Sequence, residues 1–288
     1  MVIHTTKETL TQALSLKRNN ARKAGKNYKI GFVPTMGALH EGHLSLVLKA
    51  LEENDVVVVS IFVNPTQFNN SNDLEKYPRT PEKDLSLLEG ITKDLIIYLP
   101  QVFDIYGDDV ASKQYDFEGL EFEMEGKHRK GHFDGVGTVL TKFFQIVEPT
   151  KAYFGEKDFQ QLQIVKKLVA VNKIPVEIVG CPILREENGL AMSSRNARLT
   201  KQQFEEASLI YKSLTEVREK FDSHSIADLN KIVAERFLQN EDIQLEYFEI
   251  ANEDTLKTAL EKANATKYRA FIAAFLGEVR LIDNMPLN

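Results

Sequence analysis

The stretch at residues 56–63 (VVVVSIFV) constrains the fold of this chain more than any other feature. Every residue in it except Ser60 is apolar, and most are β-branched, which favours a strand. A strand that is apolar on both faces belongs inside a parallel sheet covered by helices. We therefore expect a central strand of an α/β domain here.

Alternating strand-like and helix-like segments surround this run. Further short apolar runs that predict strands lie at 29–34, 95–99, 151–154 and 176–179. Between them, helix faces are predicted by the spacing of Leu44, Val47, Leu48 and Leu51, and of Leu162, Val165 and Val169. This alternation predicts a Rossmann-like doubly wound parallel sheet.

The pattern changes near residue 184. Polar helical stretches at 201–220 and 225–240 are followed by strand-like runs at 244–251, 268–276 and 279–283. We therefore expect two domains: a Rossmann-like domain at 1–183, and a smaller C-terminal α+β domain at 184–288 that acts as a lid.

Length, charge and cysteine content narrow the class of protein. The chain has 288 residues and a formal net charge of −6, which argues against broad binding to nucleic acid or to anionic membranes. The sequence has no signal-peptide run and no stretch near the ~20 apolar residues of a membrane helix. Its single cysteine, Cys181, excludes an internal disulfide and favours a core position. We expect a cytoplasmic protein.

The first candidate site is residues 34–43 (PTMGALHEGH), between a predicted strand and a predicted helix. Ligands of such folds bind outside the carboxyl ends of the strands, at helix N-termini. Gly37 and Gly42 permit a close backbone approach, and a helical turn places His40 and His43 on one face. The pattern favours a polyphosphate site. A metal site and two capping histidines without another role are the alternatives.

The second candidate site is residues 62–68 (FVNPTQF), at the end of the most apolar strand. The neutral side chains of Asn64 and Gln67 beside phenylalanines suit a small, partly apolar substrate with hydroxyls and a carboxylate. A plain Asn-Pro turn is the alternative.

The third candidate site is residues 155–161 (GEKDFQQ), again between a strand and a helix. Lys157 could reach a phosphate, Asp158 could cap the helix or hold a ribose or metal, and Gln161 could face the pocket. The alternative is a solvated turn.

The fourth candidate site is residues 190–196 (LAMSSRN), near the expected domain boundary. Ser193, Ser194 and Arg195 provide hydroxyls and a guanidinium that bind phosphate well. A helix cap is the alternative. A weaker basic cluster at 127–133 (KHRKGHF) predicts either an anion-facing flap or a solvated loop.

These motifs together resemble a known family. HEGH at 40–43 and MSSR at 192–195 resemble the two signatures of the nucleotidylyltransferase superfamily. PTMGALHEGHLSL, FVNPTQF, GEKDFQQL and LAMSSRN, in this order and spacing, resemble the pantothenate synthetase (pantoate–β-alanine ligase) family. The resemblance covers residues 30–200.

The resemblance implies a carbon–nitrogen ligase that works in two half-reactions. Pantoate attacks the α-phosphate of ATP to give pantoyl adenylate and pyrophosphate, and β-alanine then displaces AMP to give pantothenate. It also implies Mg²⁺ and a homodimer. Because Lys83 interrupts the acidic run that the family often has after Arg-Thr-Pro, we expect no protein ligand to the metal.

The resemblance also assigns roles to residues. It implies an ATP site lined by Met36, Gly37, Ala38, Leu39, His40, Glu41, Gly42, His43, Gly155, Glu156, Lys157, Asp158, Leu184, Met192, Ser193, Ser194 and Arg195. Within it, His43 is the catalytic imidazole, and charge on the phosphates is stabilised by His40, Lys157, Ser193, Ser194 and Arg195. Substrate binding falls to Gln67, Gln161, Asn64, His132 and Arg129.

Two other functions compete with this interpretation. Nucleotidyl transfer to a phosphorylated acceptor would favour Arg or Lys where Asn64 and Gln67 stand. A nucleotide-binding regulatory module without turnover would not need His43, Lys157 and Ser194 at one sheet edge.

Overall fold

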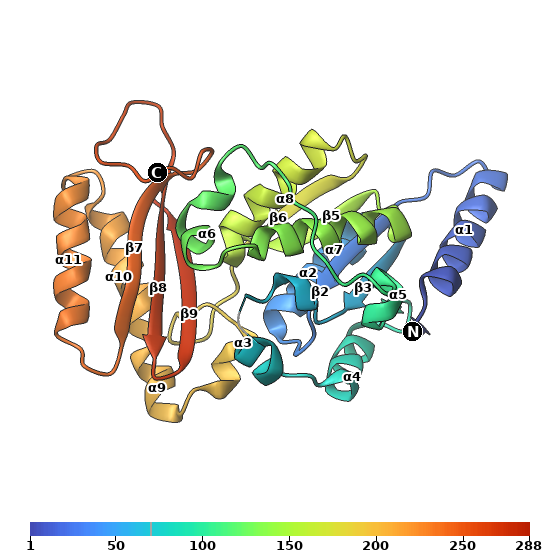
Figure 1. Cartoon of the computed structure of the whole chain (residues 1–288), viewed down its shortest axis with the longest axis horizontal. Coiled ribbons are helices and arrows are strands. Elements are labelled where there is room, and N and C mark those ends of the chain that lie inside the picture. The colour runs from blue at the N-terminus through green and yellow to red at the C-terminus, as the bar shows by residue number, and fades with distance from the viewer. Residues whose placement is uncertain (70) are drawn as a thin grey trace. The chain divides into compact units, whose positions relative to one another are not determined.

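The structure is a computed structural model that describes residues 1–69 and 71–288, and the chain divides into two compact units (Figure 1). Unit 1 comprises Met1–Phe117, Arg129–Glu156 and Ile164–Cys181. Unit 2 comprises Glu118–His128, Lys157–Gln163 and Pro182–Asn288. The domain limits 1–183 and 184–288 stay a prediction. Two short segments before residue 184, Glu118–His128 and Lys157–Gln163, belong to unit 2, although these limits assign them to the first domain.

Unit 1 is built on a six-stranded sheet in the order β1-β4-β3-β2-β5-β6, and every neighbouring pair is parallel. Its strands are β1 (Val2–His4), β2 (Ile30–Thr35), β3 (Val56–Ile61), β4 (Ile96–Tyr98), β5 (Lys151–Gly155) and β6 (Glu177–Cys181). All residues of β3 are buried, as a strand covered on both faces requires. The predicted α/β fold with a parallel sheet is confirmed.

The strand order places a ligand site at one point of this sheet. From β2 the chain moves outward through β3 and β4, and it then returns to β5 on the other side of β2. The direction of the order therefore reverses between β2 and β5. Open α/β sheets bind their ligands at the carboxyl ends of the strands that flank such a reversal.

Helices and short 3₁₀ turns connect the strands of unit 1. The helices are α1 (Lys7–Lys23), α2 (Glu41–Glu53), α3 (Ser71–Lys76), α4 (Pro81–Ile91), α5 (Val102–Tyr106) and α7 (His132–Val147), and the turn η1 is Pro65–Gln67. The helix α8 (Phe159–Val171) begins in unit 2 and ends in unit 1.

Two details of these helices differ from the sequence predictions. Leu48 is 51 % exposed, because the buried stripe of α2 centres on Val47 and Ala50 and Leu48 lies at its margin. His132 is buried at the start of α7, so the solvated-loop alternative for the basic cluster is wrong at this residue.

Unit 2 has an antiparallel sheet in the order β7-β8-β9. Its strands are β7 (Gln244–Asn252), β8 (Tyr268–Leu276) and β9 (Val279–Pro286). The helices of the C-terminal part are α9 (Lys201–Glu206), α10 (Ser208–Lys220) and α11 (Ile226–Leu238), and α10 and α11 pack against the sheet (Figure 1). The remaining elements are η2 (Leu120–Phe122), α6 (Met124–His128), η3 (Glu156–Asp158) and η4 (Ser194–Arg198).

The faces of this sheet have different characters. Apolar residues of β8 and β9 on one face, among them Ile272, Leu281 and Met285, join the core under α10 and α11. Side chains alternate along a strand, so the residues between them point to the opposite face.

None of the helices in the described part of the chain combines the length and apolar character that spanning a bilayer requires.

Candidate functional site

The loop after β2 carries the first predicted motif, and two histidines cap the helix that follows it. His40 is the N-cap of α2, and its Nδ1 accepts a hydrogen bond from the Gly42 N–H at 3.1 Å. The Nδ1 of His43 accepts from the His40 N–H at 3.4 Å. The ring centroids lie 4.1 Å apart. Both histidines therefore cap the helix, and whether they have a further role stays a prediction.

This capping fixes the tautomer of each neutral imidazole. A ring whose Nδ1 accepts a hydrogen bond carries its proton on Nε2 when it is neutral. The donating edge of each ring is then Nε2–H. An anion at this helix start would be met by two neighbouring imidazole donors.

A buried carboxylate holds the same loop from the other side. Asp84, in the first turn of α4, is only 1 % exposed and accepts from the backbone N–H groups of Ala38 at 2.9 Å and Leu39 at 2.8 Å. The hydroxyl of Thr80 also donates to it at 3.1 Å. The N–H groups of Ala38 and Leu39 are thus engaged within the protein, so the shape of this loop is held by a buried carboxylate.

The second motif forms a buried amide network around Asn64. Its Nδ2 donates to the Gln67 Oε1 at 3.1 Å and to the Gly135 carbonyl at 3.2 Å. Its Oδ1 accepts from the hydroxyls of Tyr106 at 2.6 Å and Thr66 at 3.1 Å. Burial raises the pKa of Tyr106, which keeps this hydroxyl protonated as a donor. The amide of Asn64 is therefore fully hydrogen-bonded, and one of its bonds orients Gln67.

Gln67 is the residue whose side chain this network orients. Because Asn64 occupies its Oε1, Gln67 presents Nε2, which lies 2.9 Å from the Met36 sulfur. A thioether is a weak acceptor, so a carboxylate or hydroxyl oxygen would be a better partner. The His132 Nδ1 lies 2.7 Å from the Gln67 carbonyl oxygen. The structure thus brings together the predicted residues Met36, Asn64, Gln67 and His132.

Glycine at position 135 permits this arrangement. A Cβ at Gly135 would lie 2.3 Å from the Thr66 carbonyl oxygen and 2.6 Å from the Gln67 backbone nitrogen. Helix α7 therefore packs on η1 through backbone atoms alone at this point.

The third and fourth motifs belong mainly to unit 2. Lys157 lies in η3, with its Nζ 3.9 Å from the Asp158 carboxylate. Ser193 is the N-cap of η4 and accepts from the Arg195 N–H at 3.2 Å, so the helix-cap alternative is also present. The Leu184 carbonyl accepts from the Met192 N–H at 3.0 Å. The bond between Leu184 and Met192 closes the base of the 184–196 loop, and Ser193 caps the turn η4 that follows.

The residue next to the predicted Gln161 has a structural task. Gln160 is buried, and its Nε2 donates to the carbonyls of Leu120 and Glu123, both at 2.8 Å. Its Oε1 accepts from the Glu125 N–H at 3.0 Å. Gln160 thus ties the 118–128 segment to the start of α8.

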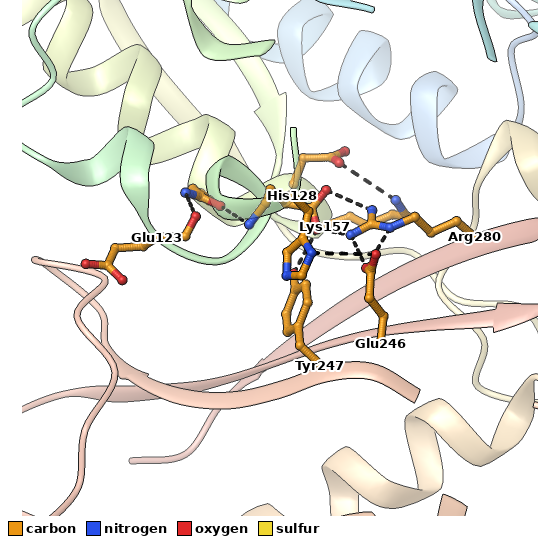
Figure 2. Close-up of polar contacts among 9 residues, drawn as sticks. Glu123, His128, Lys157, Glu246, Tyr247 and Arg280 are labelled. Atoms are coloured by element: carbon orange, nitrogen blue, oxygen red, sulfur yellow. Dashed lines mark hydrogen bonds and ion pairs between the residues drawn. The ribbon is translucent and has the colours of Figure 1, made fainter. Parts of the chain in front are cut away.

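A charged cluster fastens α6 to the sheet of unit 2, as Figure 2 shows. Arg280 binds both carboxylate oxygens of Glu125, at 2.9 and 2.7 Å, and its Nε reaches Glu246 at 2.8 Å. Tyr247 donates to Glu125 at 2.8 Å, and its ring stacks on His128 (Figure 2). The short segment before Arg129 is therefore an integral part of unit 2.

The predicted residues fall into two sets. Unit 1 holds Met36–His43, Asn64, Gln67, Arg129, His132, Gly155 and Glu156, and unit 2 holds Lys157, Asp158, Gln161, Leu184 and Met192–Arg195. Sequence reasoning gave no role to Asp84, Tyr106 or Gly135. Among the side chains that the structure describes, no three of His, Cys, Asp or Glu form a group that could hold a metal ion.

Comparison with known proteins identifies the family. The family model described as pantoate-beta-alanine ligase matches residues 2–286. The pantothenate synthetase of Flavobacterium psychrophilum is 57 % identical over 90 % of this chain and 92 % of its own length. That of Christiangramia forsetii is 51 % identical over the full length of both chains.

Solved structures agree with the sequence comparison. The pantothenate synthetase of Thermus thermophilus superposes with a TM-score of 0.89 at 37 % identity, and covers 100 % of this chain and 99 % of its own. The pantoate-beta-alanine ligase of Francisella tularensis, solved with beta-gamma ATP and beta-alanine, gives a TM-score of 0.79 at 38 % identity, with 100 % and 98 % covered. The family predicted from the four motifs is thus confirmed, and the chain belongs to the pantoate–β-alanine ligase family.

Proposed function

We propose that this chain condenses pantoate with β-alanine, using ATP and releasing AMP and pyrophosphate through a pantoyl adenylate. The observation that carries the proposal is the paired Nε2 edge of His40 and His43 at the start of α2, in a chain that matches the ligase family from residue 2 to residue 286. A free carboxylate is a poor acyl donor, and its adenylate has a good leaving group.

In the first half-reaction, a carboxylate oxygen of pantoate bonds to the α-phosphorus of ATP while the bond to pyrophosphate breaks. Negative charge then shifts to the departing pyrophosphate and the non-bridging oxygens. Nε2–H donors of His40 and His43 are oriented before the reaction, so they stabilise this charge without rearrangement. Lys157, Ser193, Ser194 and Arg195 are proposed as further phosphate ligands.

In the second half-reaction, the amine of β-alanine bonds to the acyl carbon and loses a proton as AMP departs. Gln67 is proposed to hold pantoate through Nε2, in place of the weak bond to the Met36 sulfur. Asn64 keeps that amide in its orientation. Contacts of Gln161, His132 and Arg129 with the substrate are proposed from the resemblance alone.

Mg²⁺ is proposed to arrive with ATP. This ion keeps several waters and commonly binds substrate phosphates with few protein ligands. The described residues offer no group of His, Cys, Asp or Glu that fits a metal ion, so no step here depends on a protein-bound metal. A homodimer is likewise proposed from the resemblance. A cytoplasmic location stays the prediction made from the sequence.

Isotope exchange tests the stepwise mechanism. Labelled pyrophosphate is expected to enter ATP when ATP, Mg²⁺ and pantoate are present and β-alanine is absent. Omitting pantoate removes the nucleophile and should abolish the exchange. Exchange that requires β-alanine would contradict formation of the adenylate before the amine binds, and would indicate a concerted reaction or an obligatory ternary complex.

A further inference from the structure

Two consecutive residues near the end of β9 contact the two loops that carry the predicted phosphate ligands of unit 2. Asn284 donates from Nδ2 to the Lys157 carbonyl at 2.8 Å. Asp283 accepts from both terminal nitrogens of Arg185, at 2.6 and 3.0 Å. Both side chains are almost fully buried, at 2 % and 3 % exposure.

Strand geometry explains how neighbours reach different loops. Successive side chains of a strand point to opposite faces of the sheet. Asp283 shares the face of Leu281 and Met285, which pack into the core under α10 and α11. Asn284 points to the other face, where it pairs in register with Phe271, and Phe271 packs on Phe159 at the start of α8.

Asn284 is itself held in place, so it can hold Lys157. Its Oδ1 accepts from the Arg269 Nη1 at 2.6 Å. The Arg269 guanidinium lies 3.9 Å from the ring centre of Phe159, and its Nε bonds to Glu253 at 2.7 Å. The backbone of Lys157 is thus fixed to β9 immediately before α8 begins.

Arg185 fixes the other loop, residues 185–196, in a similar way. Besides Asp283, it binds the Gly189 carbonyl at 3.0 Å and lies 4.4 Å from the ring centre of Tyr211. Gly189 has φ +89°, and a Cβ there would overlap the Tyr211 ring. Arg185 also pairs with Ala191 in an antiparallel bridge, one residue before Met192. Asp283 therefore anchors the base of the loop that leads to Ser193, Ser194 and Arg195.

We propose that Asp283 and Asn284 are positioning residues, through which a single site on β9 sets both the Lys157 loop and the 185–196 loop for phosphate binding. The inference rests on the proposed function, because it assumes that Lys157 and Arg195 act on ATP. Neither side chain touches the substrate in this scheme. Each acts through the loop that it holds.

The sharpest variant is Asn284→Asp. It keeps the size of the side chain and the oxygen that accepts from Arg269, but it replaces the Nδ2 donor by an oxygen that faces the Lys157 carbonyl. Displacement of a reacting group by about 1 Å can cost on the order of 10²-fold in rate. We expect pantoate-dependent pyrophosphate exchange to fall by at least about tenfold.

Asn172→Asp is the matched control. Asn172 also donates Nδ2 to a backbone carbonyl at 2.8 Å, that of Leu168, but it belongs to unit 1 and to no predicted site. The same chemical change there should leave the exchange rate at the wild-type level.

A double-mutant cycle separates positioning from general support of the fold. If Asn284 acts through Lys157, Asn284→Asp should lower the exchange rate little further in a chain that already carries Lys157→Ala. The effects of substitutions in groups that act as a unit are not additive. Arg185→Lys keeps the charge beside Asp283 but loses the bidentate geometry. In the second cycle, it should lower the exchange rate little further in a chain that already carries Arg195→Ala.

Three results would overturn the proposal: wild-type exchange in Asn284→Asp, fully additive losses in both cycles, or loss of the folded circular dichroism spectrum in both Asn284→Asp and Arg185→Lys. The last result would assign these residues to stability alone. Absence of pantoate-dependent exchange in the wild-type chain is a separate result, because it would contradict the proposed function before any variant is compared.

Discussion

His43 gives a direct test at the scale of a single residue. Its Nδ1 is engaged with the His40 N–H, so Nε2 is the atom that we expect to meet the phosphate charge. Removing one preorganised donor of this kind costs about 2.7–4 kcal/mol, or on the order of 10²–10³ in rate. His43→Ala should lose that much in single-turnover formation of the adenylate.

The control for this variant is His224→Ala. His224 lies in an exposed turn of unit 2, where its Nδ1 contacts the Ser223 hydroxyl, and it belongs to no predicted site. It should react at the wild-type rate. A His43→Ala enzyme that matched it would remove the imidazole from the mechanism.

Single residues also show where sequence reasoning ends. His40, His43, Asn64 and Gln67 could be singled out as candidates because each lies in the segment that directly follows a predicted strand. Asp84 could not, since a carboxylate after a proline at a helix start is normally exposed, and nothing local indicates its burial. The partners of Asp283 and Asn284 lie 98 and 127 residues away in the chain.

At the scale of an element, Asp84 determines how the β2–α2 loop is held. Asp84→Asn keeps the shape but leaves only one acceptor for the two N–H groups of Ala38 and Leu39. A buried donor without a partner costs about 1–3 kcal/mol. We expect the free energy of unfolding in urea to fall by about that amount.

Asp94→Asn is the comparison for this measurement. Asp94 is exposed before β4, and such surface changes usually shift stability by no more than about 0.5 kcal/mol. Equal unfolding free energies for the two variants would show that Asp84 does not hold the loop.

Elements differ in how readily their sequence predicts them. The strands β2 to β6 were predicted because their apolar runs are short and bounded by turns. Helix α7 was missed although its sequence carries a helical pattern. Its polar residues Asp134, Thr138, Thr141 and Gln145 are spaced i, i+4, i+7 and i+11 along one stripe, opposite the buried Val136, Leu140 and Val147.

For the whole molecule, acid stability depends in part on Glu53. Its carboxylate is bonded by Lys49 at 2.9 Å, Lys151 at 3.0 Å and the Tyr153 hydroxyl at 2.9 Å. These partners, Lys49 foremost, lower the pKa of Glu53 from 4.5 to about 2. A lowered pKa in the folded state stabilises the fold above the ordinary pKa, and this contribution is lost as the pH falls through the folded value.

The prediction concerns Glu53→Gln. Its melting temperature should lie below that of the wild type at pH 7, and the difference should shrink below pH 4.5 and be lost as the pH falls through about 2. Thermal melts followed by circular dichroism across this range measure it. A difference that stays constant down to pH 2 would show that the ionised carboxylate is not the stabilising group.

The close approach at Gly135 has a consequence for how the substrate preference of this chain can change. Helix α7 and the turn of Gln67 approach each other so closely that a Cβ at Gly135 would overlap backbone atoms of Thr66 and Gln67. Substitutions at neighbouring positions can change the side chains there, but a side chain at position 135 would displace the backbone of Gln67. A mutational library that aims to admit a bulkier acid should therefore keep glycine at position 135 and vary Met36, whose sulfur accepts only a weak hydrogen bond from Gln67.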